Sequence, residues 1–178
     1  MESNEQIERA PEGRTNRTNN NHPNDQLPMP GTYTDLRFHV VFSTKHREAW
    51  ITPELQTRLY PFIAGIVSDE RGLLLEIGGM PDHVHLLIGW RTDESLANLM
   101  RNIKARSSAW IHREFPNMVK FAWQEGYGAF TVSHSVVPKV RQYIQTQPEH
   151  HRRKTFQEEF LELLKAHEIE YDERHVFD

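Results

Sequence analysis

The sequence predicts an α+β domain of the ferredoxin-like, split βαβ type, in which helices pack on one face of an antiparallel central sheet. The predicted elements follow one another in the order β-α-β-β-α-β, which is the order of that fold. Segments with alternating β-branched and aromatic residues are separated by segments in which apolar residues recur at helical spacing. The 178 residues are enough for one domain with its own core.

Each predicted element has its own sequence signal. Thr52 is a suitable helix cap because Pro53 follows it in the first helical position, and Pro61 is expected to kink that helix. Gly78–Asp82 is expected to form a turn between two strands. The elements are a strand over 32–44, a helix capped by Thr52 that ends at Arg71-Gly72, strands over 73–77 and 83–90, a long helix that starts at Asp93 or Ser95 and ends before Pro116, a strand over 126–133, and helices over 136–147 and 155–168.

Composition separates a central domain from its ends. Residues 1–30 are rich in Asn, Pro, Glu and Arg and nearly lack apolar residues, so we expect a disordered tail before a domain over 31–168 and a short tail over 169–178. The absence of cysteine excludes disulfides, zinc–thiolate sites and thiol nucleophiles. No apolar run approaches the roughly 18 residues of a membrane span, so we expect a cytoplasmic protein without a membrane partner.

The net charge of −4 is unevenly distributed. Residues 1–30 carry −2 and residues 156–178 carry −6, whereas the stretch 31–155 carries +4. A mildly basic middle favours contact with phosphates, and the acidic helix near the end is expected to lie away from a nucleic acid. The chain also contains 11 histidines, so metal binding has to be considered.

His83 and His85 form the first candidate site. Side chains alternate along a strand, so both imidazoles project from the same face, roughly 6.6 Å apart along the strand. Two ring nitrogens at that spacing can converge on one cation. The alternative is a pair of histidines that are hydrogen-bonded at a sheet surface, because burying them unpaired would be costly.

Tyr143 and Gln147 form the second candidate site. Positions four residues apart share one face of a helix, so a phenol and an amide oxygen could face the histidine pair together. Gln147 could then supply a third metal ligand, and Tyr143 a nucleophile. The alternative is that Val140, Tyr143 and Ile144 form an ordinary core stripe.

Several basic residues are candidates for contact with a phosphate backbone, although an ordinary solvated helix face is the better explanation for any one of them taken alone. They are Lys45 and Arg47 after the first strand, and Arg101, Lys104 and Arg106 on the long helix.

Taken together and in order, five segments resemble the single-tyrosine HUH transposases of the insertion-sequence two-hundred and six-hundred-five group. They are HVVFSTKHRE (39–48), GGMPDHVHLLI (78–88), IKARSSAW (103–110), WQEGYGAFTVSHS (123–135) and VRQYIQTQPEHH (140–151). The similarity covers about residues 31–165.

The resemblance implies a role for each candidate residue. His83 and His85 match the family's metal-binding pair, Tyr143 its nucleophile and Gln147 its third ligand. The implied metal is Mg²⁺ or Mn²⁺, and the implied partner is single-stranded DNA with hairpins at the element ends. The implied reaction is a metal-assisted transesterification through a 5′-phosphotyrosine. Family members form homodimers in which the tyrosine can complete the partner's site.

Other functions are compatible with the same residues. A replication initiator or relaxase uses a similar histidine pair and tyrosine, but such proteins are usually larger. A non-catalytic or domesticated relative that binds single-stranded nucleic acid would give strand binding without a covalent product. A structural or metal-storing role is the remaining alternative.

Overall fold

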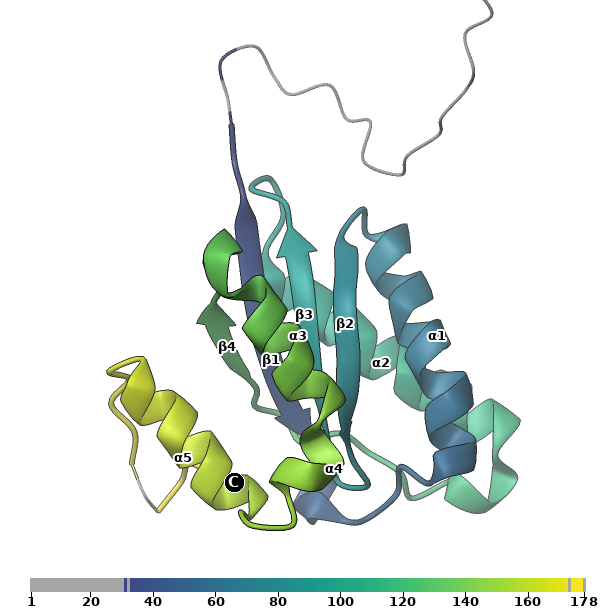
Figure 1. Cartoon of the computed structure of the whole chain (residues 1–178). Coiled ribbons are helices and arrows are strands. Elements are labelled where there is room, and N and C mark those ends of the chain that lie inside the picture. The colour runs from purple at the N-terminus through teal and green to yellow at the C-terminus, as the bar shows by residue number, and fades with distance from the viewer. Residues whose placement is uncertain (1–30, 32, 173, 178) are drawn as a thin grey trace, which may run out of the picture. The chain divides into compact units, whose positions relative to one another are not determined.

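Four antiparallel strands form one sheet in the order β2–β3–β1–β4 in the computed structural model, which describes residues 31, 33–172 and 174–177 (Figure 1). The predicted disordered tail, residues 1–30, lies outside the described residues. The strands are β1 (Leu36–Ser43), β2 (Leu73–Met80), β3 (His83–Trp90) and β4 (Gly128–Thr131). This strand order and pairing confirm the ferredoxin-like α+β fold.

Helices α1 (Pro53–Asp69) and α2 (Leu96–Glu114) cover one face of the sheet. Thr52 and Ser95 cap them, each by accepting a hydrogen bond from a backbone amide of the first turn. Pro61 lies within α1 without ending it. The apolar stripes of both helices meet alternate strand residues to form the main core. Its fully buried members include Val40, Val84, Leu86 and Ile88.

Three further helices cover the opposite face, so the expectation of helices on one face only was incomplete (Figure 1). They are α3 (Val137–Gln145), α4 (Gln147–His150) and α5 (Phe156–Ala166). The cause is that β1 and β3 carry apolar residues on both faces: Leu87 packs with Ile144 of α3, and Val41 with Phe156 of α5. Strands that are buried on both sides need cover on both sides.

Two element boundaries in the structure differ from those predicted from the sequence, and both differences affect the candidate site. Residues 78–80, predicted as a turn, continue β2 and pair with the start of β3. The helix predicted over 136–147 ends at Gln145, and Gln147 begins α4 after a non-helical Thr146. Pro148 explains this break because proline lacks an amide hydrogen and disfavours a helical conformation in the preceding residue.

The segment after α5 packs against that helix. Tyr171, Val176 and Phe177 are partly buried against the apolar cluster of α5 and β4, and residues 34–178 form one compact unit. Within the described part of the chain, no helix is both long and apolar enough to cross a membrane.

Candidate metal centre and tyrosine site

His83 and His85 project from the same face of β3 and are fully buried. Their ring centroids are 5.1 Å apart. This is the face that α3, α4 and α5 cover. The alternation predicted from the sequence therefore places both imidazoles between the sheet and the later helices.

The outer ring nitrogen of each histidine is already engaged. Nδ1 of His83 lies 2.7 Å from a carboxylate oxygen of Asp82, and Nδ1 of His85 lies 3.0 Å from Nε2 of His39. Such partners fix the ring orientation and leave the other nitrogen free, as is typical of metal-binding histidines. The Nε2 atoms of His83 and His85 therefore face the space between the sheet and the helices.

Gly78 allows α3 to approach the sheet at this point. It pairs with His85 in the β2–β3 ladder, and a Cβ atom at this position would lie 2.5 Å from the backbone oxygen of Ile144. The close approach brings Tyr143 within reach of the histidines, with its ring centroid 5.9 Å from that of His85. Gln147 is fully buried beside it. The two predicted pairs, on β3 and on α3–α4, thus meet in one site.

Glu159 of α5 lies at the centre of this site with only 1% of its surface exposed. Its Oε1 accepts hydrogen bonds from the Tyr143 hydroxyl and, at 2.9 Å, from Nε2 of Gln147. Its Oε2 lies 3.0 Å from Nε2 of His151. One carboxylate therefore contacts residues of α3, α4 and the following linker.

Burial and the Glu159 carboxylate shift the pKa values of the titratable side chains in this site. Burial lowers the pKa of His85 to about 4 and that of His39 to about 3, so both are neutral near pH 7. Burial, followed by the contact with Glu159, raises the pKa of Tyr143 well above its usual value. Burial alone would raise the pKa of Glu159, but its contacts with His85, Tyr143 and Gln147 outweigh burial and hold that pKa below its usual range.

The donor atoms fit a divalent cation. Five buried side-chain polar atoms among the described residues have no hydrogen-bond partner, and three of them are Nε2 of His83, Nε2 of His85 and Oε1 of Gln147. Buried polar atoms are rarely left unpaired, so three together point to a missing partner. Candidate ligand atoms of His83, His85, His151 and Glu159 also lie within 4.8 Å of one another. Neutral imidazole with oxygen donors suits a divalent metal ion.

Three residues of the site were missed by the sequence analysis: His39, His151 and Glu159. His39 lies in the strand that faces His85, and the register of β1 against β3 places them diagonally on one face. Val41 pairs with His85, and alternation along β1 places His39 on the same face as Val41. This alternation was the signal in the sequence that could have identified His39. For Glu159 the available signal was helical spacing, because it lies three residues after Phe156 and four before Leu163, at the edge of the apolar stripe of α5.

A family comparison decides the class of this protein. The family model described as "Transposase IS200 like" matches residues 32–147, which is more than half of the chain. The chain belongs to the IS200-like transposase family. Transposases are enzymes that recombine DNA.

Related proteins agree with this assignment. The transposase is 22% identical over 122 residues to the ISDra2 transposase TnpA of Deinococcus radiodurans, covering 66% of this chain and 87% of that protein. It is 24% identical over 131 residues to the transposase of insertion sequence IS200 from Salmonella typhimurium, covering 70% and 85%.

Two solved structures share the fold of the transposase. A transposase crystal structure from Deinococcus radiodurans superposes with a TM-score of 0.56 at 25% identity, covering 66% of this chain and 94% of that one. A REP-associated tyrosine transposase bound to a REP hairpin superposes with a TM-score of 0.53 at 15% identity, covering 67% and 71%.

The basic residues predicted to contact DNA are not gathered in one place. Arg101, Lys104 and Arg106 lie on α2, which covers the face of the sheet opposite to Tyr143. Burial lowers the pKa of Lys104 to about 8, and its ammonium donates to three backbone oxygens, those of residues 124–126. Arg106 pairs with Asp69. Lys104 thus holds the loop before β4.

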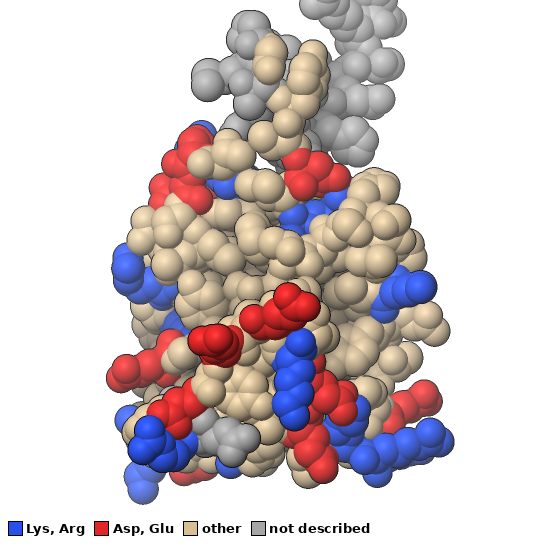
Figure 2. All heavy atoms as spheres, turned by 90° about the vertical axis from the view of Figure 1, so that its left-hand side faces the viewer, with Lys and Arg blue, Asp and Glu red and all other residues tan. Residues whose placement is uncertain are grey.

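A different group of basic residues lies next to the metal centre. Arg47 and the linker residues Arg152, Arg153 and Lys154 line a pocket of about 550 Å³ that also includes Asp82 and His151. On the side of the transposase formed by α5 and β4, acidic and basic side chains are interspersed over the lower half (Figure 2). Arg47 is thus the one residue of the five predicted DNA contacts that lines this pocket. Lys45 is exposed two positions before it in the chain.

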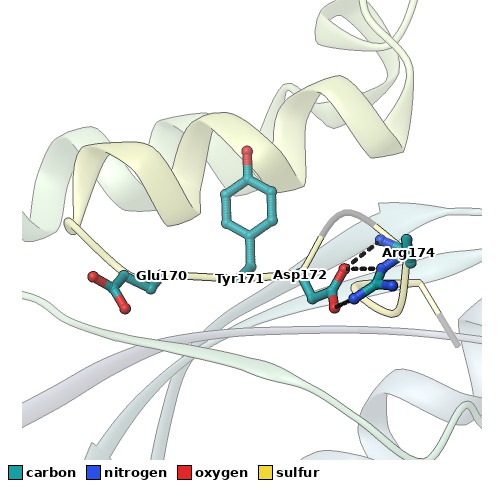
Figure 3. A pocket seen from close by; sticks show the side chains of 4 residues that line it. All are labelled: Glu170, Tyr171, Asp172 and Arg174. Carbon is teal, nitrogen blue, oxygen red and sulfur yellow. Dashed lines mark hydrogen bonds and ion pairs between the residues drawn. The ribbon is translucent and has the colours of Figure 1, made fainter.

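A second pocket lies in the segment after α5. Glu170, Tyr171, Asp172 and Arg174 line it, and Asp172 binds Arg174 through paired contacts (Figure 3). Tyr171 points toward the helix, whereas the other side chains turn away from it. None of the residues that surround Tyr143 lines this pocket, so it is not part of the candidate site.

Proposed function

We propose that this transposase cuts and rejoins single-stranded DNA at element ends by transesterification through Tyr143. The observation that carries the proposal is the convergence of three unpaired, buried donor atoms from His83, His85 and Gln147 beside the Tyr143 phenol. A buried core stripe would not require unpaired nitrogen and oxygen atoms next to a tyrosine.

His83, His85 and Gln147 would hold Mg²⁺ or Mn²⁺. When bound, such a cation polarises the scissile phosphate and stabilises its developing charge, which contributes several kcal/mol. Asp82 and His39 keep the two imidazoles in place through their Nδ1 atoms. Because the pKa of His85 is low, no proton competes with a cation for its Nε2 near pH 7.

Tyr143 would supply the attacking oxygen. Its phenolic oxygen forms a bond to phosphorus while the bond from phosphorus to the 3′-oxygen breaks, and the phenolic proton ends on the released 3′-hydroxyl. The 5′-phosphotyrosine that results keeps the energy of the phosphodiester. Attack by a 3′-hydroxyl on this linkage then joins the new ends and returns the proton to Tyr143.

The DNA strand would approach along the pocket of Arg47 and residues 152–154, which adjoins His151. Lys45, Arg101 and Arg106 remain predicted phosphate contacts of secondary importance, because Arg106 already pairs with Asp69. Lys104 is no longer proposed as one, because its ammonium donates to three backbone oxygens. The related REP-associated transposase was solved with a hairpin, and we extend hairpin recognition to the DNA of this chain. We further propose that it acts as a homodimer in the cytoplasm.

A denaturing-gel assay tests the proposal. Purified protein is mixed with labelled single strands that carry the element's end hairpins, with Mn²⁺ or with chelator. We expect a metal-dependent, protein-sized shift of the label that is lost in Tyr143→Phe and retained in Tyr171→Phe. Tyr171 is a matched control because it lies in the C-terminal pocket of Figure 3.

The same assay separates the alternatives. Strand binding that survives chelation, with no covalent product on any cognate substrate, would leave a non-catalytic or domesticated relative that binds single-stranded nucleic acid. A covalent adduct that persists in Tyr143→Phe would contradict the assigned nucleophile.

A further inference from the structure

Helix α5 is fixed against the sheet by close apolar contacts. Phe156, Phe160 and Leu164 pack with Val41 and Phe130 of the sheet. A Cβ atom at Gly128 would lie 2.7 Å from the Phe160 ring, so glycine is required for this approach. Thr155 and Glu158 form a reciprocal capping box at its first turn. The position of Glu159, one residue further on, is therefore set by the packing of the helix.

The two oxygens of Glu159 face different partners. Oε1 holds the Tyr143 hydroxyl and the Gln147 amide. Oε2 lies 3.6 Å from Nε2 of His85 and 3.9 Å from Nε2 of His83, too far for hydrogen bonds. Two atoms that each lie about 2.1 Å from one cation are roughly 3–4 Å apart, so these distances suit ligands of a shared ion.

This carboxylate also has no cationic partner of fixed charge among the described residues. A buried carboxylate is costly unless it is paired with a positive charge. Among the described residues, the ion-pair partners of Glu159 are histidines, and no lysine or arginine lies within ion-pair distance. A divalent cation between Glu159 and the two Nε2 atoms would supply the missing charge.

We propose that Glu159 is a further metal ligand of this chain, which binds the cation through Oε2 and holds the Tyr143 hydroxyl through Oε1. The proposal rests on the proposed function, because it adds a carboxylate to the His83, His85 and Gln147 set. An added carboxylate favours Mg²⁺ and Mn²⁺, which prefer oxygen donors. One side chain would thereby link the cation to the nucleophile.

Mn²⁺ binding to the full chain tests this assignment without DNA. Free Mn²⁺ is measured by electron paramagnetic resonance, and water-proton relaxivity reports how many waters remain on the bound ion. We expect Glu159→Gln to weaken binding at least tenfold and to raise the relaxivity per bound ion, because water replaces the lost ligand. Glu162→Gln removes the same charge from an exposed position three residues along α5 and should leave both quantities unchanged.

Three results distinguish the possible failures. If Glu159→Gln binds Mn²⁺ with unchanged affinity, or with lower affinity but unchanged relaxivity, Glu159 is not a ligand. If the wild-type chain and His83→Ala bind Mn²⁺ equally weakly, the metal site itself is wrong and the proposed function fails with it. Glu159→Asp keeps the charge on a shorter side chain and should bind Mn²⁺ more tightly than Glu159→Gln. Near-UV circular dichroism shows whether Glu159→Gln is folded, and if it is not, Glu159→Asp provides the test.

Discussion

Nε2 of His39 lies 3.0 Å from Nδ1 of His85, and the two imidazole rings are stacked with an interplanar angle of 21°. Because burial keeps both rings neutral near pH 7, they share a single proton along this contact. When His85 donates this proton from Nδ1, its Nε2 is a free acceptor on the side of Glu159 and Tyr143.

Replacing His39 tests this relationship. We expect His39→Ala to lower Mn²⁺ affinity by roughly 10–100-fold, the usual effect of removing the outer partner of a metal-binding histidine. Isothermal titration calorimetry measures it. His134→Ala, at an exposed histidine near the start of α3, should bind as the wild type does. Equal affinity in both variants would show that His39 does not orient His85.

Gly78 gives a second prediction because it sets the distance between α3 and the sheet. Gly78→Ala should lower the free energy of unfolding by about 1–3 kcal/mol, since the new methyl group would overlap the Ile144 carbonyl and displace the helix. Urea unfolding measures this change. Gly126→Ala is the matched control because its Cβ would meet no atom within 4 Å, and no loss of stability beyond about 0.5 kcal/mol is expected there.

The arrangement within one chain predicts the outcome of a mixing experiment. Tyr143 and His85 of the same chain contact Glu159 together, so Tyr143→Phe and His83→Ala proteins should not restore each other's cleavage when they are mixed or co-expressed. Each variant alone should be inactive in the gel assay. Recovery of a substantial fraction of wild-type activity would indicate that the tyrosine works in the partner's site.

Lys104 is expected to matter for stability and not for DNA. Lys104→Met leaves three backbone oxygens without their donor, so the free energy of unfolding should fall by about 1–3 kcal/mol. Strand affinity at fixed salt should change less than twofold. Lys120→Met, at an exposed lysine, controls for loss of charge. A large loss of DNA affinity in Lys104→Met with unchanged stability would restore the phosphate contact first predicted for this residue.

Arg153 is expected to contact the phosphate backbone. In Arg153→Gln, the salt dependence of single-strand binding should become shallower by about 0.7 in the slope of log affinity against log salt, the value for one phosphate contact. The loss should be similar for different sequences. Arg113→Gln removes an exposed charge from the end of α2, on the opposite face, and should leave the slope unchanged.

The sequence was sufficient to predict the fold because its signals are local. Alternation in β1 and β3 and the caps at Thr52 and Ser95 depend on near neighbours in the chain. His83 and His85 could be paired for the same reason, since their spacing alone places them on one face. The break at Thr146 was harder to predict, although Pro148 marks it, because helix ends are set by one or two residues.

The proximity of Glu159 to the histidines could not be predicted from the sequence. Glu159 lies 74 positions after His85, and only the packing of α5 on β1 and β4 brings the two together. Helical spacing places Glu159 at the edge of the apolar stripe of α5, but a glutamate is rarely buried unless it is paired, and the sequence does not show its partners. The expectation that the acidic helix lies away from a nucleic acid stays a prediction, although the structure places Glu159 of this helix beside the histidines.

The region that defines the family ends at residue 147, whereas His151 and Glu159 lie beyond it. A protein trimmed to residues 32–147 would therefore keep His83, His85 and Tyr143 but lose α5, which packs on the same face of the sheet. The histidine side chains would be exposed to bulk water, and the Tyr143 hydroxyl would lose the acceptor that Glu159 provides. For protein engineering, the candidate site of this transposase thus extends beyond the region that its family model matches.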